Sequence, residues 1–406
     1  MRRRTLLASS GFAASGLLLT RGRDLLSRWT HTWTAMPQLT EPHNMPPTPF
    51  ERLADTTLRQ TVRVTAGGRR LRVRYSNAFG TADLPITAAA VALPVGNQAG
   101  TSAIRPGTSR PLTFGGSPSV VVPVGAQIVS DPVDLPVLAA ANLTLTTYLR
   151  EGIATAELTS HPGSRTTSWL VKGDQHTALD LTGATGSDHW YLISGVEVLA
   201  GASGLVLLGD SLTDGRGSTT NGNNRWPDQL FDRLRDPELA VLNQAAGGNR
   251  VLRDGLGPNA LARLDRDVLS TSGARWLLVF EGVNDIGVAP ATVADQQRIT
   301  AELIGAYRQI MLRAQAAGLR AYGATLTPFG GNIYDDAEGL REQSRQTVNA
   351  AIRGGLFDAV VDFDAAVRDP AAPSRLAAPY DTGDHLHLNP TGYGALAAAV
   401  PRRLLR

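Results

Sequence analysis

The chain has 406 residues, of which 42% are hydrophobic, and this length is enough for two domains with their own cores. It contains no cysteine, which excludes disulfide bridges, thiolate metal sites and catalysis by a cysteine nucleophile. The formal net charge is +3, much of it near the N-terminus, and no other block of like charge stands out. The composition therefore gives little support to nucleic-acid or anionic-lipid binding.

The first residues resemble an export signal. Three arginines at 2–4 precede Thr5-Leu6-Leu7, and a small and apolar run then reaches Leu19. Adjacent arginines followed by two leucines also resemble a twin-arginine signal, and a run of about 14 residues is too short for a convincing membrane span. We expect residues 1–28 to be this signal and the mature protein to be extracellular, with a net charge of −2. A basic amphipathic start without signal function is the alternative.

Residues 29–200 are predicted to form a β-rich domain. Apolar residues alternate with polar ones along 58–64 and 71–75, and Gly67-Gly68 between them predicts a hairpin turn. Further strands are predicted, separated by turns rich in proline, glycine and asparagine, at 88–93, 120–124, 142–149, 166–171 and 190–199. Many short strands with such turns predict an antiparallel sandwich of jelly-roll-like form.

This region offers few candidates for chemistry. Four tryptophans could stack on a sugar, although packing in a core or interface is their more common role: Trp29, Trp33, Trp169 and Trp190. His161 stands alone beside a proline, which is typical of a loop residue more than of a catalytic group or ligand.

Residues 203–406 alternate strands with helices. Strands are predicted at 205–208, 240–242, 276–280, 320–326 and 359–363, and helices at 295–317, 337–352 and 391–405. Gly318 stands where a glycine commonly ends a helix. This alternation predicts a parallel sheet covered on both faces, in which ligands bind at the carboxyl ends of the strands.

Four polar segments follow predicted strands or precede the last helix. Ser211 follows the first strand, and paired glycines at 247–248 follow the second, where free N–H groups can approach a ligand. Asn284 follows the third strand, and Asp384 and His387 come just before the last helix. Each has an ordinary alternative, because serine, asparagine and aspartate also cap helices and glycines form flexible turns.

Together these residues supply the groups that acyl transfer requires. Ser211 would be the nucleophile, His387 the general base and then the acid, and Asp384 the group that orients the imidazole. The N–H groups of Ser211 and Gly248 and the Asn284 amide would form the oxyanion hole. Thr213 occupies the position of the last glycine in a G-x-S-x-G elbow, which disfavours an α/β-hydrolase.

Four segments, GDSLTDG, AAGGN, GVND and DHLH, resemble in order the signature blocks of the SGNH (GDSL-type) hydrolase family. The resemblance covers roughly residues 204–400. It implies a flavodoxin-like three-layer α/β/α fold, a metal-free ester hydrolase without a cofactor, and the roles given above to Ser211, Gly248, Asn284, Asp384 and His387. The β-rich region also resembles the accessory domain of secreted members. Gly247 replaces a serine found in many members, and the backbone role of the block survives this change.

Two other functions stay open at this point. His385 and His387 with Asp381 and Asp384 could hold a metal ion, although no other histidine of the α/β region could complete the site. A secreted carbohydrate-binding protein with an inert hydrolase domain is the second alternative. For the esterase, the substrate is expected to be a small-molecule or polysaccharide ester, with its selectivity in loops such as 219–226 and 330–336.

Overall fold

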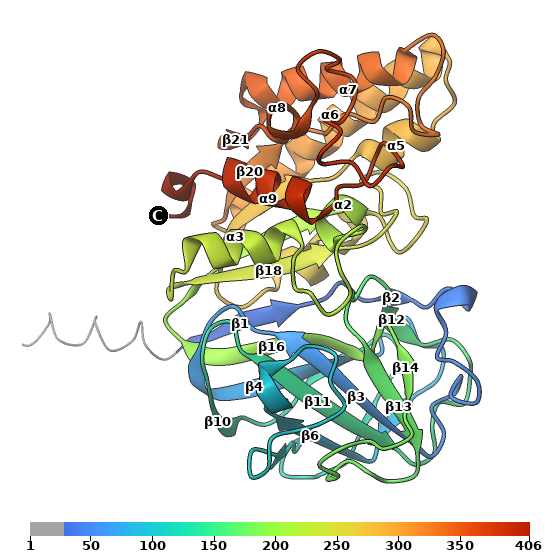
Figure 1. The fold of residues 1–406 in the computed structure, drawn as a ribbon, viewed down its shortest axis with the longest axis vertical. Helices are drawn as coiled ribbons and strands as arrows, with labels where there is room; N and C mark the ends of the chain where they lie inside the picture. Colours follow the sequence, from blue (N-terminus) through green and yellow to red (C-terminus); the bar gives the residue numbers. More distant parts are fainter. Residues whose placement is uncertain (1–27) are drawn as a thin grey trace, which may run out of the picture.

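A computed structural model describes residues 28–406, so the predicted export signal lies almost wholly outside the described residues. Figure 1 shows a β-rich half below and an α/β half above, joined where β1 and β16 lie beneath β18. Along the chain, antiparallel pairings end with β16 at Ala200 and parallel pairings begin with β17 at Ser203. Among residues 28–406, no helix is both long enough and apolar enough to cross a bilayer.

The β-rich half contains antiparallel sheets. One has the order β1-β16-β4-β10, with β9 also beside β4: β1 (Arg28–Thr34), β16 (Ile193–Ala200), β4 (Gly68–Ser76), β10 (Val133–Val137) and β9 (Gln127–Val129). A second has the order β14-β13-β3-β11-β6-β7: β14 (Thr185–Ser187), β13 (Ser168–Lys172), β3 (Thr56–Arg63), β11 (Asn142–Leu149), β6 (Ala88–Ala92) and β7 (Arg110–Pro111). Two smaller sheets join β15 (Trp190–Tyr191), β12 (Thr159–His161) and β2 (Gln38–Leu39), and β5 (Leu84–Ile86) and β8 (Val120–Val122). The strand content is as expected, while the jelly-roll-like sandwich stays a prediction.

The predicted hairpin at Gly67-Gly68 is wrong, because β3 and β4 lie in different sheets. β3 pairs with β11 and β13, whereas β4 pairs with β16, β10 and β9. The residues between β3 and β4 bond to two different parts of the fold. Val64 N donates to Ala141 O, just before β11, and Thr65 N donates to Thr32 O of β1. The alternation of apolar and polar residues shows which side chains share a face of a strand, but not which strand it pairs with. The passage of the chain from one sheet to the other therefore could not be predicted from it.

The α/β half is built on five parallel strands in the order β18-β17-β19-β20-β21: β17 (Ser203–Gly209), β18 (Leu239–Ala245), β19 (Ala274–Phe280), β20 (Arg320–Ala324) and β21 (Ala359–Val361). In chain order this is 2-1-3-4-5, the flavodoxin-like order. Leu205 to Leu208 are all at most 1% exposed, as expected for a strand covered on both faces.

Two groups of helices pack around this sheet. The helices are α2 (Ser211–Asp214), α3 (Trp226–Leu234), α4 (Ala260–Leu264), α5 (Val283–Val288), α6 (Val293–Ala316), α7 (Leu340–Ala351), α8 (Phe363–Val367) and α9 (Pro390–Ala399). Single-turn segments complete the set: η1 (Pro42–Asn44), η2 (Val95–Asn97), η3 (Asp265–Leu269), η4 (Ile352–Leu356) and η5 (Arg402–Leu405). α3 and α8 pack on α9, whereas α4, α5 and α7 pack on α6 (Figure 1).

The helices predicted at 295–317 and 337–352 are confirmed as α6 and α7. Gly318 follows α6 with a φ of +76°, a backbone conformation that glycine adopts readily. The predicted helix at 391–405 is too long, because α9 ends at Ala399. Pro401 lacks an N–H and disfavours a helical conformation at Val400, so the chain restarts as a separate short turn.

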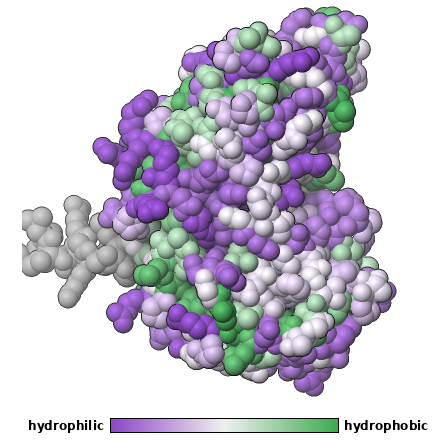
Figure 2. Space-filling view, in the orientation of Figure 1, coloured by the Kyte–Doolittle hydropathy of each residue, from purple (hydrophilic) through white to green (hydrophobic). Residues whose placement is uncertain are grey.

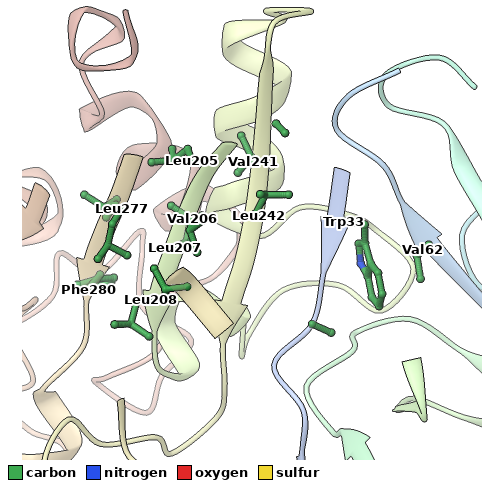
Figure 3. Packing of buried hydrophobic residues seen from close by; sticks show 14 of the residues in the cluster. Trp33, Val62, Leu205, Val206, Leu207, Leu208, Val241, Leu242, Leu277 and Phe280 are labelled. Atoms are coloured by element: carbon green, nitrogen blue, oxygen red, sulfur yellow. The ribbon is translucent and has the colours of Figure 1, made fainter. Parts of the chain in front are cut away.

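The two halves share one hydrophobic cluster. Figure 3 shows the side chains of β17, β18 and β19 and, across from β18, Trp33 of β1 beside Val62 of β3. Thr34 Oγ1 donates to Asn243 O at 3.0 Å, and Thr65 Oγ1 lies 3.1 Å from Val241 O and 3.0 Å from Val241 N. The face in Figure 2 is mainly hydrophilic over the α/β half, with apolar residues gathered lower down, over the β-rich half.

Candidate active site

A cleft of about 400 Å³ lies over the carboxyl ends of β17, β18 and β19 and is lined by both halves of the protein. The α/β half contributes Ser211, Asp214, Arg216, Gly247, Gly248, Leu256, Asn284, Tyr334, Leu386 and His387. The β-rich half contributes Gln38, Glu41, His43, Asn44, His161, Pro162, Gly163, Arg165 and His189. All the predicted site residues except Asp384 therefore line one cleft, and Asp384 reaches it through His387.

The structure brings Ser211, His387 and Asp384 into one hydrogen-bonded row. Ser211 is the first residue of α2, directly after β17, and Asp210 caps that helix by accepting from Leu212 N at 3.0 Å. Ser211 Oγ lies 2.9 Å from His387 Nε2. His387 Nδ1 lies 2.6 Å from Asp384 Oδ2, and Asp384 Oδ1 accepts from His387 N at 2.8 Å. This is the geometry in which an imidazole can take a proton from a hydroxyl.

The environment of this row favours neutral His387 beside a charged Asp384. Burial lowers the pKa of His387 below its ordinary value of 6.5, and the attraction of Asp384 offsets only part of that effect. Burial acts to raise the pKa of Asp384, but hydrogen bonds from the His387 ring and from the N–H groups of His387 and Leu386 outweigh it and hold the pKa well below its ordinary value. The histidine is therefore ready to act as a base near neutral pH.

The three N–H donors predicted for an oxyanion hole are available to a ligand. Among the described residues, neither Ser211 N nor Gly248 N donates to another group. Gly248 has a φ of +70°, and a Cβ there would lie 2.5 Å from Leu256, so the turn requires glycine. One N–H of the Asn284 amide donates to Asn249 O at 2.9 Å, which leaves the second for a ligand.

Tyr334 fixes the orientation of the Asn284 amide. Its hydroxyl donates to Asn284 Oδ1 at 3.0 Å, which turns the amide nitrogen of Asn284 away from Tyr334. Tyr334 belongs to the segment 330–336, which the sequence marked only as a loop that could select substrates. Neither Asn284 nor Asp285 caps α5, whose N-cap is Gly282. Asp285 instead accepts from Val251 N and Leu252 N at 2.8 and 3.0 Å and so holds the loop after Gly248.

Buried carboxyl groups support the strand ends beneath the cleft. Burial raises the pKa of Asp210 to about 7, that of Asp285 to about 6 and that of Glu281 to about 8. Arg263, which is also buried, lies 3.4 Å from Glu281 and donates to Asn249 Oδ1 at 2.9 Å. Arg263 and Asp285 thereby hold the residues that follow the glycine loop (Gly247-Gly248), and none of these four groups lines the cleft.

His161 is not the loop residue that the sequence predicted. It lies in β12, is 4% exposed, and stacks on Trp190 with ring centroids 5.8 Å apart. Its Nε2 lies 2.9 Å from Asp214 Oδ1, while Asp214 Oδ2 accepts from Gly247 N at 3.1 Å. A Cβ on Gly163 would lie 1.7 Å from Asp214, so the loop after β12 packs directly on this carboxylate. The β-rich half thus reaches the glycine loop through one buried pair.

The tryptophans serve mainly in packing, the more common role considered for them. Trp33 and Trp190 are 6% and 3% exposed and meet edge to face at 4.9 Å. Trp169 donates its indole N–H to Gly100 O at 2.8 Å, and Arg72 lies over Trp29 at 4.5 Å. Among the described residues that line the cleft, Tyr334 is the only tyrosine, tryptophan or phenylalanine.

The histidines considered for a metal site belong to separate pairs. His385 Nδ1 lies 2.6 Å from Asp381 Oδ2, while His387 faces Asp384 and Ser211. Within residues 28–406, no three side chains of His, Asp or Glu converge in a way that could hold a metal ion. The arrangement therefore favours the serine-based interpretation of this segment.

Comparisons with known proteins address the α/β half. Residues 207–395 match the model of the GDSL-like Lipase/Acylhydrolase family. No curated protein sequence matches the chain.

Solved structures of similar proteins include an acetylxylan esterase from Geobacillus stearothermophilus, at 21% identity over 49% of this chain and 93% of that one, with a TM-score of 0.36. A lipase/acylhydrolase from Enterococcus faecalis is 18% identical over 50% and 95% of the two chains, with a TM-score of 0.36. A GDSL-like lipase from Bacteroides thetaiotaomicron is 17% identical over 48% and 85%, with a TM-score of 0.35. The family match and the parallel sheet support the assignment of residues 207–395 to the GDSL-like lipase/acylhydrolase (SGNH) family.

Proposed function

We propose that the protein is a secreted serine esterase that cleaves acyl or acetyl esters through an acyl-enzyme. The observation that supports this most directly is the row in which Ser211 Oγ lies 2.9 Å from His387 Nε2 and His387 Nδ1 lies 2.6 Å from Asp384 Oδ2. The location outside the cell rests on the resemblance of residues 1–28 to an export signal.

The reaction proceeds in two halves. Ser211 Oγ attacks the ester carbonyl carbon while His387 Nε2 takes the hydroxyl proton, and Asp384 stabilises the imidazolium. The carbonyl oxygen becomes an oxyanion facing Ser211 N, Gly248 N and the Asn284 amide, and each such donor is worth roughly 100- to 1,000-fold in turnover. His387 then gives its proton to the alkoxide as the carbon–oxygen bond breaks. Water, activated by His387, cleaves the acyl-Ser211 ester and releases the acid.

A fluorophosphonate probe tests this assignment. It should inactivate hydrolysis of p-nitrophenyl acetate in step with labelling, and peptide mapping should locate one phosphonyl group on Ser211. Ser218 serves as the comparison, because its hydroxyl donates to Gly215 O and is not expected to react with the probe. Ester hydrolysis that continues in fully labelled protein, or labelling at another residue, would contradict the proposed nucleophile.

The acid limb of the pH–rate profile is expected to lie below pH 6.5. Ser211 can be activated only while His387 is neutral, so activity is lost when the pH falls through the pKa of His387. Burial lowers that pKa from 6.5, which moves the loss of activity to lower pH. The measurement is kcat/KM for p-nitrophenyl acetate between pH 4 and 8, because this ratio reports the free enzyme. A midpoint above 6.5 would show that His387 is stabilised as a cation, contrary to this geometry.

A further inference from the structure

Arg165 extends from the β-rich half into the cleft that contains Ser211. Its Nε is buried without a hydrogen-bond partner, and none of its guanidinium nitrogens pairs with an oxygen of the described residues. Buried donors in folded proteins nearly always have a partner, so an unpaired guanidinium facing a cleft indicates that a ligand supplies the acceptor.

The backbone holds Arg165 in this position under strain. Its φ is +50°, which residues other than glycine rarely adopt and which clusters at functional sites. Arg165 O accepts from Asn221 N at 2.9 Å, and the preceding Ser164 donates its hydroxyl to Thr166 O at 2.8 Å. The strained conformation is thus fixed from both sides, and it directs the side chain toward the cleft.

Neither arginine of the cleft has an ion-pair partner among the described residues, whereas both carboxylates there accept hydrogen bonds. Asp214 is paired with His161 and accepts from Gly247 N, and Glu41 accepts from Gln38 and Asn44. Arg216, at the exposed rim, has no side-chain partner among residues 28–406. Both guanidinium groups are therefore available to an anionic ligand.

The position of the arginines indicates which part of the substrate carries that charge. His387 gives its proton to the leaving alcohol, so the alcohol part of the ester must lie beside His387. Arg216 lies beside the loop that contains His387, because a Cβ on the neighbouring Gly217 would lie 2.5 Å from Leu388 O. Arg165 is tied to the same 216–221 segment, because its O accepts from Asn221 N at 2.9 Å. Both arginines consequently lie on the alcohol side, whereas Gly248 and Asn284 face the acyl oxygen.

We propose that Arg165 binds an anionic group, a carboxylate or a phosphate, on the alcohol part of the ester, with Arg216 assisting at the rim. This inference rests on the proposed esterase function. A guanidinium can form two parallel hydrogen bonds to either anion, so the shared chemistry is an oxyanion with two adjacent acceptor oxygens. The substrate class is then acyl esters of hydroxy acids, acidic sugars or phosphorylated alcohols.

Two matched pairs of acetyl esters test this proposal with the full-length protein. The phosphate pair is 1-acetylglycerol 3-phosphate against 1-acetylglycerol, and the carboxylate pair is O-acetyllactate against O-acetyllactamide. Acetate release gives kcat/KM for each. The wild-type protein is expected to prefer the anionic member of at least one pair by about 10- to 100-fold, the range for hydrogen bonds to charged groups. The pair that shows the preference distinguishes phosphate from carboxylate.

Arg165→Met should reduce that preference toward one, and Arg165→Lys should keep part of it because the charge remains without the planar fork. Arg308→Met is the matched control, since it removes an exposed arginine of α6 and should leave the preference unchanged. Thermal unfolding of each variant checks that the fold is retained, and Arg165→Lys serves if Arg165→Met does not fold. Equal rates for both members of both pairs, or a preference retained in the Arg165 variants, would overturn this inference while leaving the esterase intact. Cleavage of none of the four esters, with Ser211 unlabelled by the probe, would overturn both.

Discussion

Replacing Ser211 by alanine is expected to lower kcat/KM for p-nitrophenyl acetate by about 10,000- to 1,000,000-fold. The change removes the only atom that can form the acyl-enzyme, while the oxyanion donors and the cleft remain. The side-chain hydroxyl of Ser211 bonds only to His387 among the described residues, so the fold should lose little stability. The measurement is steady-state hydrolysis together with the thermal unfolding temperature of both proteins.

Ser218→Ala is the matched control for this change. Its hydroxyl lies four residues after the end of α2 and donates only to Gly215 O at 2.6 Å, so activity should stay near the wild-type value. A Ser211→Ala protein that keeps substantial activity, insensitive to the fluorophosphonate probe, would mean that water is activated directly and that no acyl-enzyme forms. The proposed mechanism would then be wrong at its first step.

The α/β half could be predicted from the sequence because its signals are local. Continuous apolar runs such as 205–208 specify buried parallel strands, and the carboxyl ends of such strands necessarily meet at one edge of the sheet. Asp384 and His387 are three residues apart, so their pairing needs only a short loop. The exception is the C-terminal helix, where the helical composition of 391–405 outweighed the effect of Pro401.

The contribution of the β-rich half to the cleft could not be predicted in the same way. His161 of β12 and Asp214 of α2 are 53 residues apart in the chain, and nothing near His161 in the sequence marks their contact. The same holds for Arg165, one arginine among many, and for Tyr334, whose bond to Asn284 depends on how a loop folds back. The hairpin predicted at Gly67-Gly68 was wrong for the same reason, because the partner of a strand is set by the whole fold.

The His161–Asp214 pair gives the β-rich half a direct effect on the proposed oxyanion hole. His161 Nδ1 lies 3.0 Å from Met36 O, and a carbonyl oxygen can only accept, so this nitrogen carries a proton. The proton shared between Nε2 and Asp214 then makes an imidazolium–carboxylate pair. Burial acts to raise the pKa of Asp214, but the charge and hydrogen bond of His161, together with the charges of Arg165 and Arg225, outweigh it and lower that pKa. Asp214 in turn holds Gly247 N, next to the Gly248 donor.

His161→Phe is expected to lower kcat for p-nitrophenyl acetate by about 100-fold with a much smaller change in KM. Phenylalanine keeps a ring against Trp190 but offers no N–H to Met36 O or to Asp214. Asp214 is then buried without its hydrogen-bonded cation, and breaking such a pair costs about 3–5 kcal/mol of stability. A movement of Asp214 shifts Gly247-Gly248, and a displacement of about 1 Å at an oxyanion donor is enough for a loss in kcat of about 100-fold. Steady-state kinetics and thermal unfolding measure the two effects separately.

Thr65→Val distinguishes positioning from general weakening of the contact between halves. It removes the Thr65 Oγ1 bonds to Val241, which join the same halves away from the cleft, and should lower the unfolding temperature without changing kcat. Adding Asp214→Asn to His161→Phe removes the uncompensated charge while an amide oxygen can still accept from Gly247 N, so kcat should partly recover. If His161→Phe behaves like Thr65→Val, with lower stability and normal kcat, the pair only joins the halves and the glycine loop holds its shape without it.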